Sequence, residues 1–155
     1  MRGNLFILSL FISISGCKHT HTLPGKLSKP QKCAIPYELT SNTSKITIIG
    51  VFTTWSLKSQ IQLQRFRKVA SLLNTKRVSF YIVLTDPDQK IVEDWIEAYK
   101  PVFPVLYDPK FTLCSRLISK VPTVIIYKKG KIYYYYSALA ETKILYKQIV
   151  DVLGN

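Results

Sequence analysis

The stretch Ile46–Ser59 reads ITIIGVFTTWSLKS and decides the fold of this chain. Its first half is an apolar run of strand length, which is typical of a strand buried on both faces. Its second half leads from Phe52 toward an amphipathic helix, expected over residues 59–74, with Phe66 and Val69 on its apolar face. A buried strand that runs directly into a helix predicts an α/β protein.

Further elements follow toward the C-terminus, each expected from apolar spacing and turn residues. They are a buried strand at Val78–Leu84, a helix through Ile91–Tyr99, an extended piece at Phe103–Leu106, a short helix near 111–118, a strand at 120–127, an antiparallel return strand at Ile132–Tyr136 and a last helix at 141–153. The first strand, helix and second strand form a right-handed βαβ unit.

The N-terminus predicts a targeting segment over residues 1–16. Arg2 supplies its positive charge, and Leu5–Ile14 is apolar but too short to span a bilayer. The segment ends in Ile14-Ser15-Gly16-Cys17, which resembles a bacterial lipobox. The resemblance implies cleavage before Cys17 and its acylation, and several acyl chains anchor a protein stably. An ordinary secretory signal with an incidental cysteine is the alternative.

Residues 17–44 are expected to form the lipidated cysteine and a tether to a domain at 45–155. His19 and His21 lie in this tether without a third metal ligand, so no metal site is expected. Lys18 follows the anchor, and by the sorting rule known for enterobacteria it favours the outer membrane. The expected location is therefore the bacterial cell envelope, facing the periplasm.

A formal net charge of +13 favours acidic partners. Export of the chain argues against nucleic acid and leaves anionic lipid headgroups or an acidic protein face. Tyr133–Tyr136 follow the lysines of the 128–131 turn, and strand alternation sends two tyrosines to each face. One pair is expected under a helix, and the other forms either an aromatic patch or an ordinary edge-strand surface.

Three local features resemble the thioredoxin fold, in the branch of TlpA-like and ResA-like thiol oxidoreductases and AhpC/TSA-related redoxins. They are Phe52-Thr53-Thr54-Trp55, Phe103-Pro104-Val105-Leu106-Tyr107-Asp108, and Val121-Pro122-Thr123 followed by Lys129-Gly130-Lys131. The resemblance covers about residues 45–153. It implies a central mixed sheet flanked by helices, with that branch's insertion at about 85–118.

The resemblance also implies a site. The peptide bond before Pro122 would be cis, and Trp55, Val121 and Pro122 would form a surface that binds extended polypeptide. The two redox cysteines of the family fall on Ser56 and Ser59, so the Cys-x-x-Cys pair is absent. The peroxiredoxin signature and the cysteine and histidine ligands of Sco-type copper chaperones are absent too.

Neither serine is expected to be catalytic. A hydroxyl cannot form a disulfide, and a serine nucleophile needs a base, whereas no histidine follows His21. Ser56 is instead expected to accept a backbone N–H at the start of the helix. No cofactor is expected.

Cys33 and Cys114 remain after Cys17 is assigned to lipid. Three interpretations stay open: a structural disulfide, a relocated redox pair without activation by a helix N-terminus, or two buried thiols. The leading hypothesis is therefore a non-enzymatic lipoprotein that binds an envelope protein or peptide, or serves as a scaffold component of a complex. The alternative is a divergent thiol–disulfide oxidoreductase that uses Cys33 and Cys114.

Overall fold

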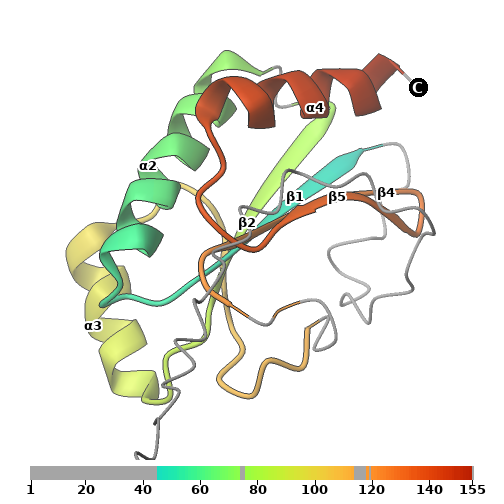
Figure 1. Cartoon of the computed structure of the whole chain (residues 1–155). Helices are drawn as coiled ribbons and strands as arrows, with labels where there is room; N and C mark the ends of the chain where they lie inside the picture. Colours follow the sequence, from blue (N-terminus) through green and yellow to red (C-terminus); the bar gives the residue numbers. More distant parts are fainter. Residues whose placement is uncertain (1–44, 74–75, 114–117, 119, 155) are drawn as a thin grey trace, which may run out of the picture.

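The computed structural model describes residues 45–73, 76–113, 118 and 120–154 (Figure 1). Its elements, in chain order, are β1 (Ile46–Phe52), α2 (Leu57–Leu72), β2 (Val78–Leu84), α3 (Gln89–Tyr99), β3 (Val105–Tyr107), β4 (Thr123–Lys128), β5 (Lys131–Tyr136) and α4 (Thr142–Gly154). The predicted targeting segment and tether, with Cys17, Cys33, His19 and His21, lie outside the described residues, and so does Cys114.

The five strands form one mixed sheet in the order β3-β2-β1-β4-β5. Strand β1 pairs with β2 in parallel and with β4 antiparallel, while β3 extends the parallel side and β5 the antiparallel side. All seven residues of β1 are buried, as expected for a central strand covered on both faces. The quoted apolar run therefore lies at the centre of the molecule.

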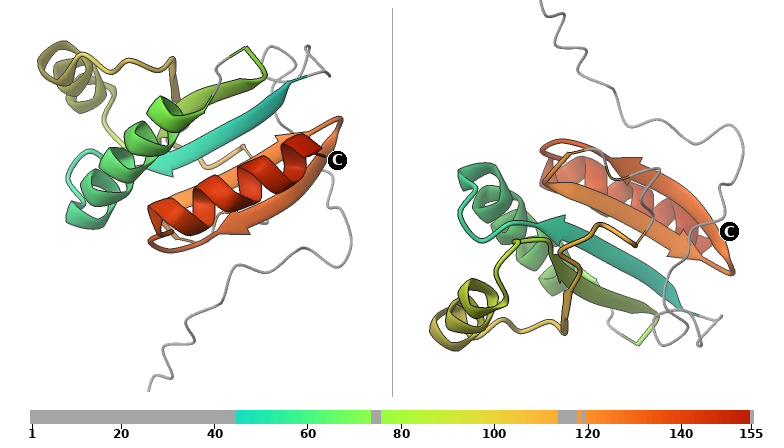
Figure 2. Two further views of the ribbon diagram at one scale, coloured as in Figure 1. Left: turned by 90° about the horizontal axis from the view of Figure 1, so that it is seen from above. Right: turned by 90° about the horizontal axis from the view of Figure 1, so that it is seen from below.

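Helices α2 and α4 cover one face of the sheet, and α3 lies beside α2 (Figures 1 and 2). The Arg67 guanidinium of α2 lies 4.2 Å from the centroid of the Tyr99 ring of α3, a cation–π contact between the two helices. The opposite face is covered in part by Leu113 and Ile118, which pack with Ile49 and Val51 of β1. The central strands β1 and β4 are thus buried on both faces.

Phe66 fixes α2 on the sheet. Its ring makes edge-to-face contacts with Phe52, Phe80 and Phe103 at centroid distances of 6.0, 5.0 and 5.6 Å. Gly50 makes room for this cluster, because a Cβ there would lie 2.5 Å from the Phe52 ring. These contacts hold the middle of α2 against the sheet.

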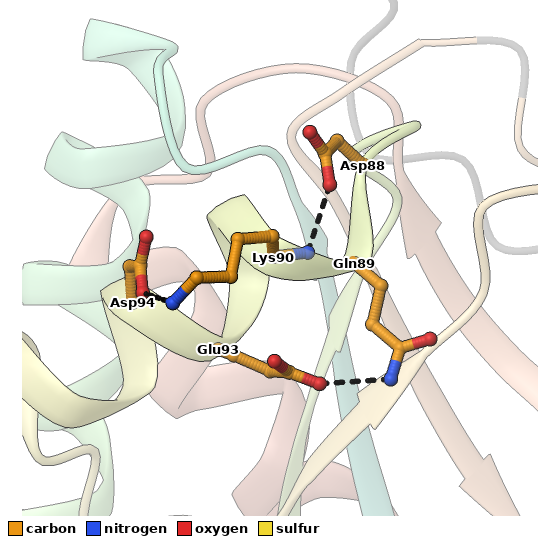
Figure 3. Close-up of polar contacts among 5 residues, drawn as sticks. All are labelled: Asp88, Gln89, Lys90, Glu93 and Asp94. Carbon is orange, nitrogen blue, oxygen red and sulfur yellow. Dashed lines mark hydrogen bonds and ion pairs between the residues drawn. The ribbon is translucent and has the colours of Figure 1, made fainter.

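Polar contacts mark the solvent-facing side of α3 (Figure 3). Asp88 caps the helix by accepting from the Lys90 backbone N–H at 2.8 Å, and Gln89 donates to Glu93. Lys90 forms an ion pair with Asp94, whose hydrogen bond and charge raise the pKa of Lys90. Exposed i, i+4 pairs of this kind contribute little to stability.

The structure confirms the α/β class and most of the expected elements, with two corrections. Residues 111–113 are not helical, because Phe111 has a φ of 50°, in the left-handed region. The Asp108 carboxylate accepts hydrogen bonds from the backbone N–H groups of Thr112 and Leu113. The rest of the helix expected near 111–118 lies largely outside the described residues.

The second correction concerns the tyrosine run. The register shifts between Ile126, which pairs with Tyr134, and Tyr127, which pairs with Ile132, so Tyr133 is an extra residue in β5. As a result three of the four tyrosines pack toward the helix-covered face and only Tyr135 toward the other. The expected two-to-two division is wrong because a β-bulge interrupts strand alternation.

Candidate functional site

The predicted site residues meet at one end of the sheet. Residues 53–56 connect β1 to α2, and Thr85 and Asp86 follow β2. Because β1 and β4 are antiparallel and Val51 pairs with Thr123, the Val121–Pro122 bond lies next to the end of β1. We call residues 53–59, 85–86 and 121–123 the Trp55 end.

Both serines of the Trp55 end accept hydrogen bonds from the backbone. Ser56 is the N-cap of α2, and its Oγ accepts from the Ser59 N–H at 3.4 Å. The Ser59 side chain is buried, and its Oγ accepts from the Thr53 N–H at 3.2 Å. The expected capping role of Ser56 is confirmed, and it starts α2 at Leu57 rather than at residue 59.

Asp86 holds the same loop from the next strand. Its carboxylate is fully buried and accepts from the Thr54 N–H at 3.0 and 3.1 Å and from Thr54 Oγ1 at 2.7 Å. This role of Asp86 was not predicted from the sequence. A polar side chain directly after a buried parallel strand was the available signal, because such strand ends border the sites of open α/β sheets.

The aromatic residue of this end faces solvent. Trp55 is 73% exposed, an unusual state for so large an apolar side chain. Val121 is half-buried and Pro122 is buried. The Val121–Pro122 bond is cis, as the resemblance implied. Trp55, Leu57, which is 69% exposed, and Val121 therefore supply the accessible apolar side chains of the Trp55 end.

Residues 56 and 59 carry hydroxyl groups, which cannot form a disulfide. No cysteine or histidine occurs among the described residues, and no group of three or more metal-ligating side chains occurs there either. Asp86, the buried carboxylate nearby in the fold, is engaged by Thr54. In the described part of the chain, the serine hydroxyls serve the local fold.

The order and pairing of the elements, with a cis-proline before β4, define a thioredoxin-like fold. A crystal structure of StoA from Bacillus subtilis matches with a TM-score of 0.59 and 24% identity, over 68% of this chain and 83% of StoA. A secreted Mycobacterium tuberculosis disulfide oxidoreductase, homologous to E. coli DsbE, matches with a TM-score of 0.59 and 16% identity, over 72% of this chain and 85% of that chain.

One curated protein is similar in sequence. The sporulation thiol-disulfide oxidoreductase A of Bacillus subtilis (strain 168) is 31% identical over 96 residues, which cover 59% of this chain and 58% of that protein. The chain thus matches little more than half the length of this relative. No family model matches the chain. These similar proteins are named as thiol–disulfide oxidoreductases, and this chain shares their fold.

Among the described residues, no helix has both the length and the apolar character needed to cross a membrane. The predicted lipid attachment at Cys17 concerns residues outside this part of the chain, and so does any bond between Cys33 and Cys114.

Proposed function

We propose that this protein binds extended polypeptide segments at the Trp55 end, without a redox pair at residues 56 and 59. The observation that carries the proposal is the combination of an exposed Trp55 with two serines that are bonded within their own loop. An exposed aromatic side chain suits recognition of apolar side chains on an extended polypeptide.

Fluorescence titration tests the binding. The probe is the alkylated B chain of insulin, and the full chain carries Trp95→Phe so that Trp55 is the single reporter. We expect the fluorescence of Trp55 to change in a saturable way as the B chain is added. Calorimetry measures the binding of variants that lack Trp55. Trp55→Ala should weaken binding of the B chain at least tenfold. The control Val102→Ala, at another apolar residue that is 72% exposed, should change it less than twofold. Equal effects of the two substitutions would refute a binding role for Trp55.

A second candidate is a thiol–disulfide oxidoreductase that uses Cys33 and Cys114. The comparisons favour this candidate, because the similar proteins are named for that activity. The cysteine pair would be oxidised to a disulfide, and its two electrons and two protons would reduce a client disulfide to two thiols. The absence of cysteine at residues 56 and 59 argues against the usual site, so the activity would depend on the relocated pair.

Insulin reduction separates the two candidates. The binding proposal predicts no turnover by the natural chain and a gain of turnover when Ser56→Cys and Ser59→Cys are combined, because the fold would then hold a Cys-x-x-Cys pair at a helix N-terminus. The oxidoreductase candidate predicts turnover that Cys114→Ser abolishes and that Ser56→Ala with Ser59→Ala leaves intact. Turnover of the second kind would overturn the first proposal.

The location is part of the proposal. One of the similar proteins is named as secreted. Export and acylation at Cys17 would place this chain on the periplasmic side of the bacterial envelope, with Lys18 favouring the outer membrane. Metabolic labelling with an alkyne fatty acid should label the natural chain and not Cys17→Ser, and equal labelling of both would refute acylation at this residue.

A further inference from the structure

Positive charge is concentrated at the end of the sheet opposite Trp55. The pairing of the strands brings these residues together, because Ile46 pairs with both Val78 and Lys128, and Lys128 pairs with Lys131 across the β4–β5 turn. Figure 2 shows this turn, the start of β1 and the last turn of α4 at the same end. We call this surface the basic end, and it consists of Lys45, Lys76, Arg77, Lys128, Lys129 and Lys131.

Two of these cations have a structural role. The buried Lys128 donates through Nζ to the Val152 carbonyl at 2.7 Å, and Arg77 donates to the Leu153 carbonyl at 3.1 Å. They bind the last carbonyls of α4, where cations complement the helix dipole. Lys129 and Lys131 are exposed on the turn. Lys128 is therefore buried in its structural role, whereas the exposed Arg77, Lys129 and Lys131 present their charge to solvent.

Negative charge is distributed differently. Asp151 is the one acidic residue at the basic end within the described ranges. The other described acidic residues lie on α3 or at the end of the sheet that carries Trp55: Asp86, Asp88, Glu93, Asp94, Glu97, Asp108 and Glu141. The domain is therefore polarised along β1, with its cations least compensated at the basic end.

The chain also enters the domain at the basic end. Lys45 directly precedes β1, so the residues before it, including Cys17, are joined to this end. The Trp55 end lies beyond the other terminus of β1, a strand of seven residues that spans roughly 23 Å at about 3.3 Å per residue.

We propose that the basic end seats the domain on an anionic phospholipid surface and turns the Trp55 end away from the bilayer. Each lysine near such a surface strengthens association about fivefold, and the attraction decays within a Debye length of about 8 Å at physiological salt. The inference rests on charge and on where the chain enters, and it holds for either candidate function.

Vesicle co-sedimentation of the full chain tests the proposal, with Cys17→Ser in every variant so that acylation does not contribute. The probes are vesicles of phosphatidylcholine alone and of phosphatidylcholine with phosphatidylglycerol at about 3:1. We expect stronger association with the anionic vesicles at low salt and loss of that difference in about 0.5 M NaCl.

Two triple variants with equal loss of charge locate the contact. Lys45→Gln, Lys129→Gln and Lys131→Gln together should weaken association with anionic vesicles at least tenfold. Lys58→Gln, Lys110→Gln and Lys120→Gln, at the end of the sheet that carries Trp55, should weaken it less than threefold. Matching thermal unfolding of both variants shows that the fold is retained. Equal weakening would overturn the proposal, since it would reflect net charge alone.

A further measurement reports orientation. With Trp95→Phe, brominated lipids should leave Trp55 fluorescence unquenched, and strong quenching would contradict the proposed orientation. Binding of polyglutamate or duplex DNA that depends on the basic end, without binding to anionic vesicles, would also overturn the proposal and assign the surface to another macromolecule.

Discussion

The loop between β1 and α2 is held by side chains from two directions. Ser56 and Ser59 bond within the loop, and Asp86 reaches it from the next strand. The capping role of Ser56 could be predicted, because it depends on residues only three positions apart. The role of Asp86 could not, because its partner Thr54 is 32 positions away and no local pattern records that contact.

Loss of the Asp86 carboxylate should loosen this loop. Asp86→Ala removes the acceptor of two Thr54 donors, and hydrogen bonds to charged acceptors contribute about 1.5–3 kcal/mol each. We expect urea unfolding to show a loss of about 2 kcal/mol or more. The control Asp88→Ala removes an equal charge and an exposed cap, worth about 1 kcal/mol. An Asp86→Ala loss no larger than that of the control would contradict this role.

At the scale of elements, apolar periodicity predicted the strands and helices well. Strand β1 and helix α2 were expected within two residues of their observed bounds, because their burial is continuous or strictly periodic. The β-bulge near Tyr133 was missed, since it depends on how β4 and β5 pair rather than on β5 alone. The left-handed Phe111 was missed for a similar reason, because the Asp108 carboxylate shapes that turn.

The hydrogen bond from Lys128 of β4 to the end of α4 should contribute to the stability of the fold. Lys128→Met keeps the buried methylene stem and removes the Nζ–H donated to the Val152 carbonyl. We expect a loss of about 2 kcal/mol in unfolding free energy, together with faster amide exchange in the last turn of α4. Lys129→Met, at an exposed position, should stay within about 0.5 kcal/mol of the natural chain. Similar losses for both substitutions would refute the predicted role of this bond.

For the whole molecule, the thioredoxin-like fold was predicted from a few motifs, and the cis bond at Pro122 agrees with the resemblance. The Trp55 end was predicted as the place where Trp55, Ser56, Ser59, Val121 and Pro122 meet, and the sheet register brings them there. The burial of Pro122 was not predicted, because it depends on packing between distant segments. The binding role of the Trp55 end stays a prediction, and the three interpretations of Cys33 and Cys114 concern residues outside the described part of the chain.

The stability of the whole molecule should depend on pH through Tyr136. Burial, and then the neighbouring Tyr134, raise the pKa of Tyr136 well above its ordinary value of about 10, and its hydroxyl donates to Gln148. The folded state therefore keeps a proton that the unfolded state releases above about pH 10, so stability falls as pH rises past that value.

Comparison with Tyr136→Phe isolates this effect from the other tyrosines and lysines. Between about pH 10 and 11 the natural chain should lose up to about 1.4 kcal/mol per pH unit more than Tyr136→Phe, whereas the difference between the two should be constant below about pH 9. Urea unfolding across this range measures both slopes. Parallel slopes throughout would show that Tyr136 does not contribute.

The course of β1 has a mechanical consequence. The chain enters the domain at one terminus of this strand, and Trp55 follows its other terminus. If the chain is anchored before Lys45 and a polypeptide binds at Trp55, as proposed, a pulling force between the two is carried along the covalent backbone of a single strand. It does not have to cross the hydrogen bonds that join β1 to β2 and β4, so the domain can transmit tension without shearing its sheet.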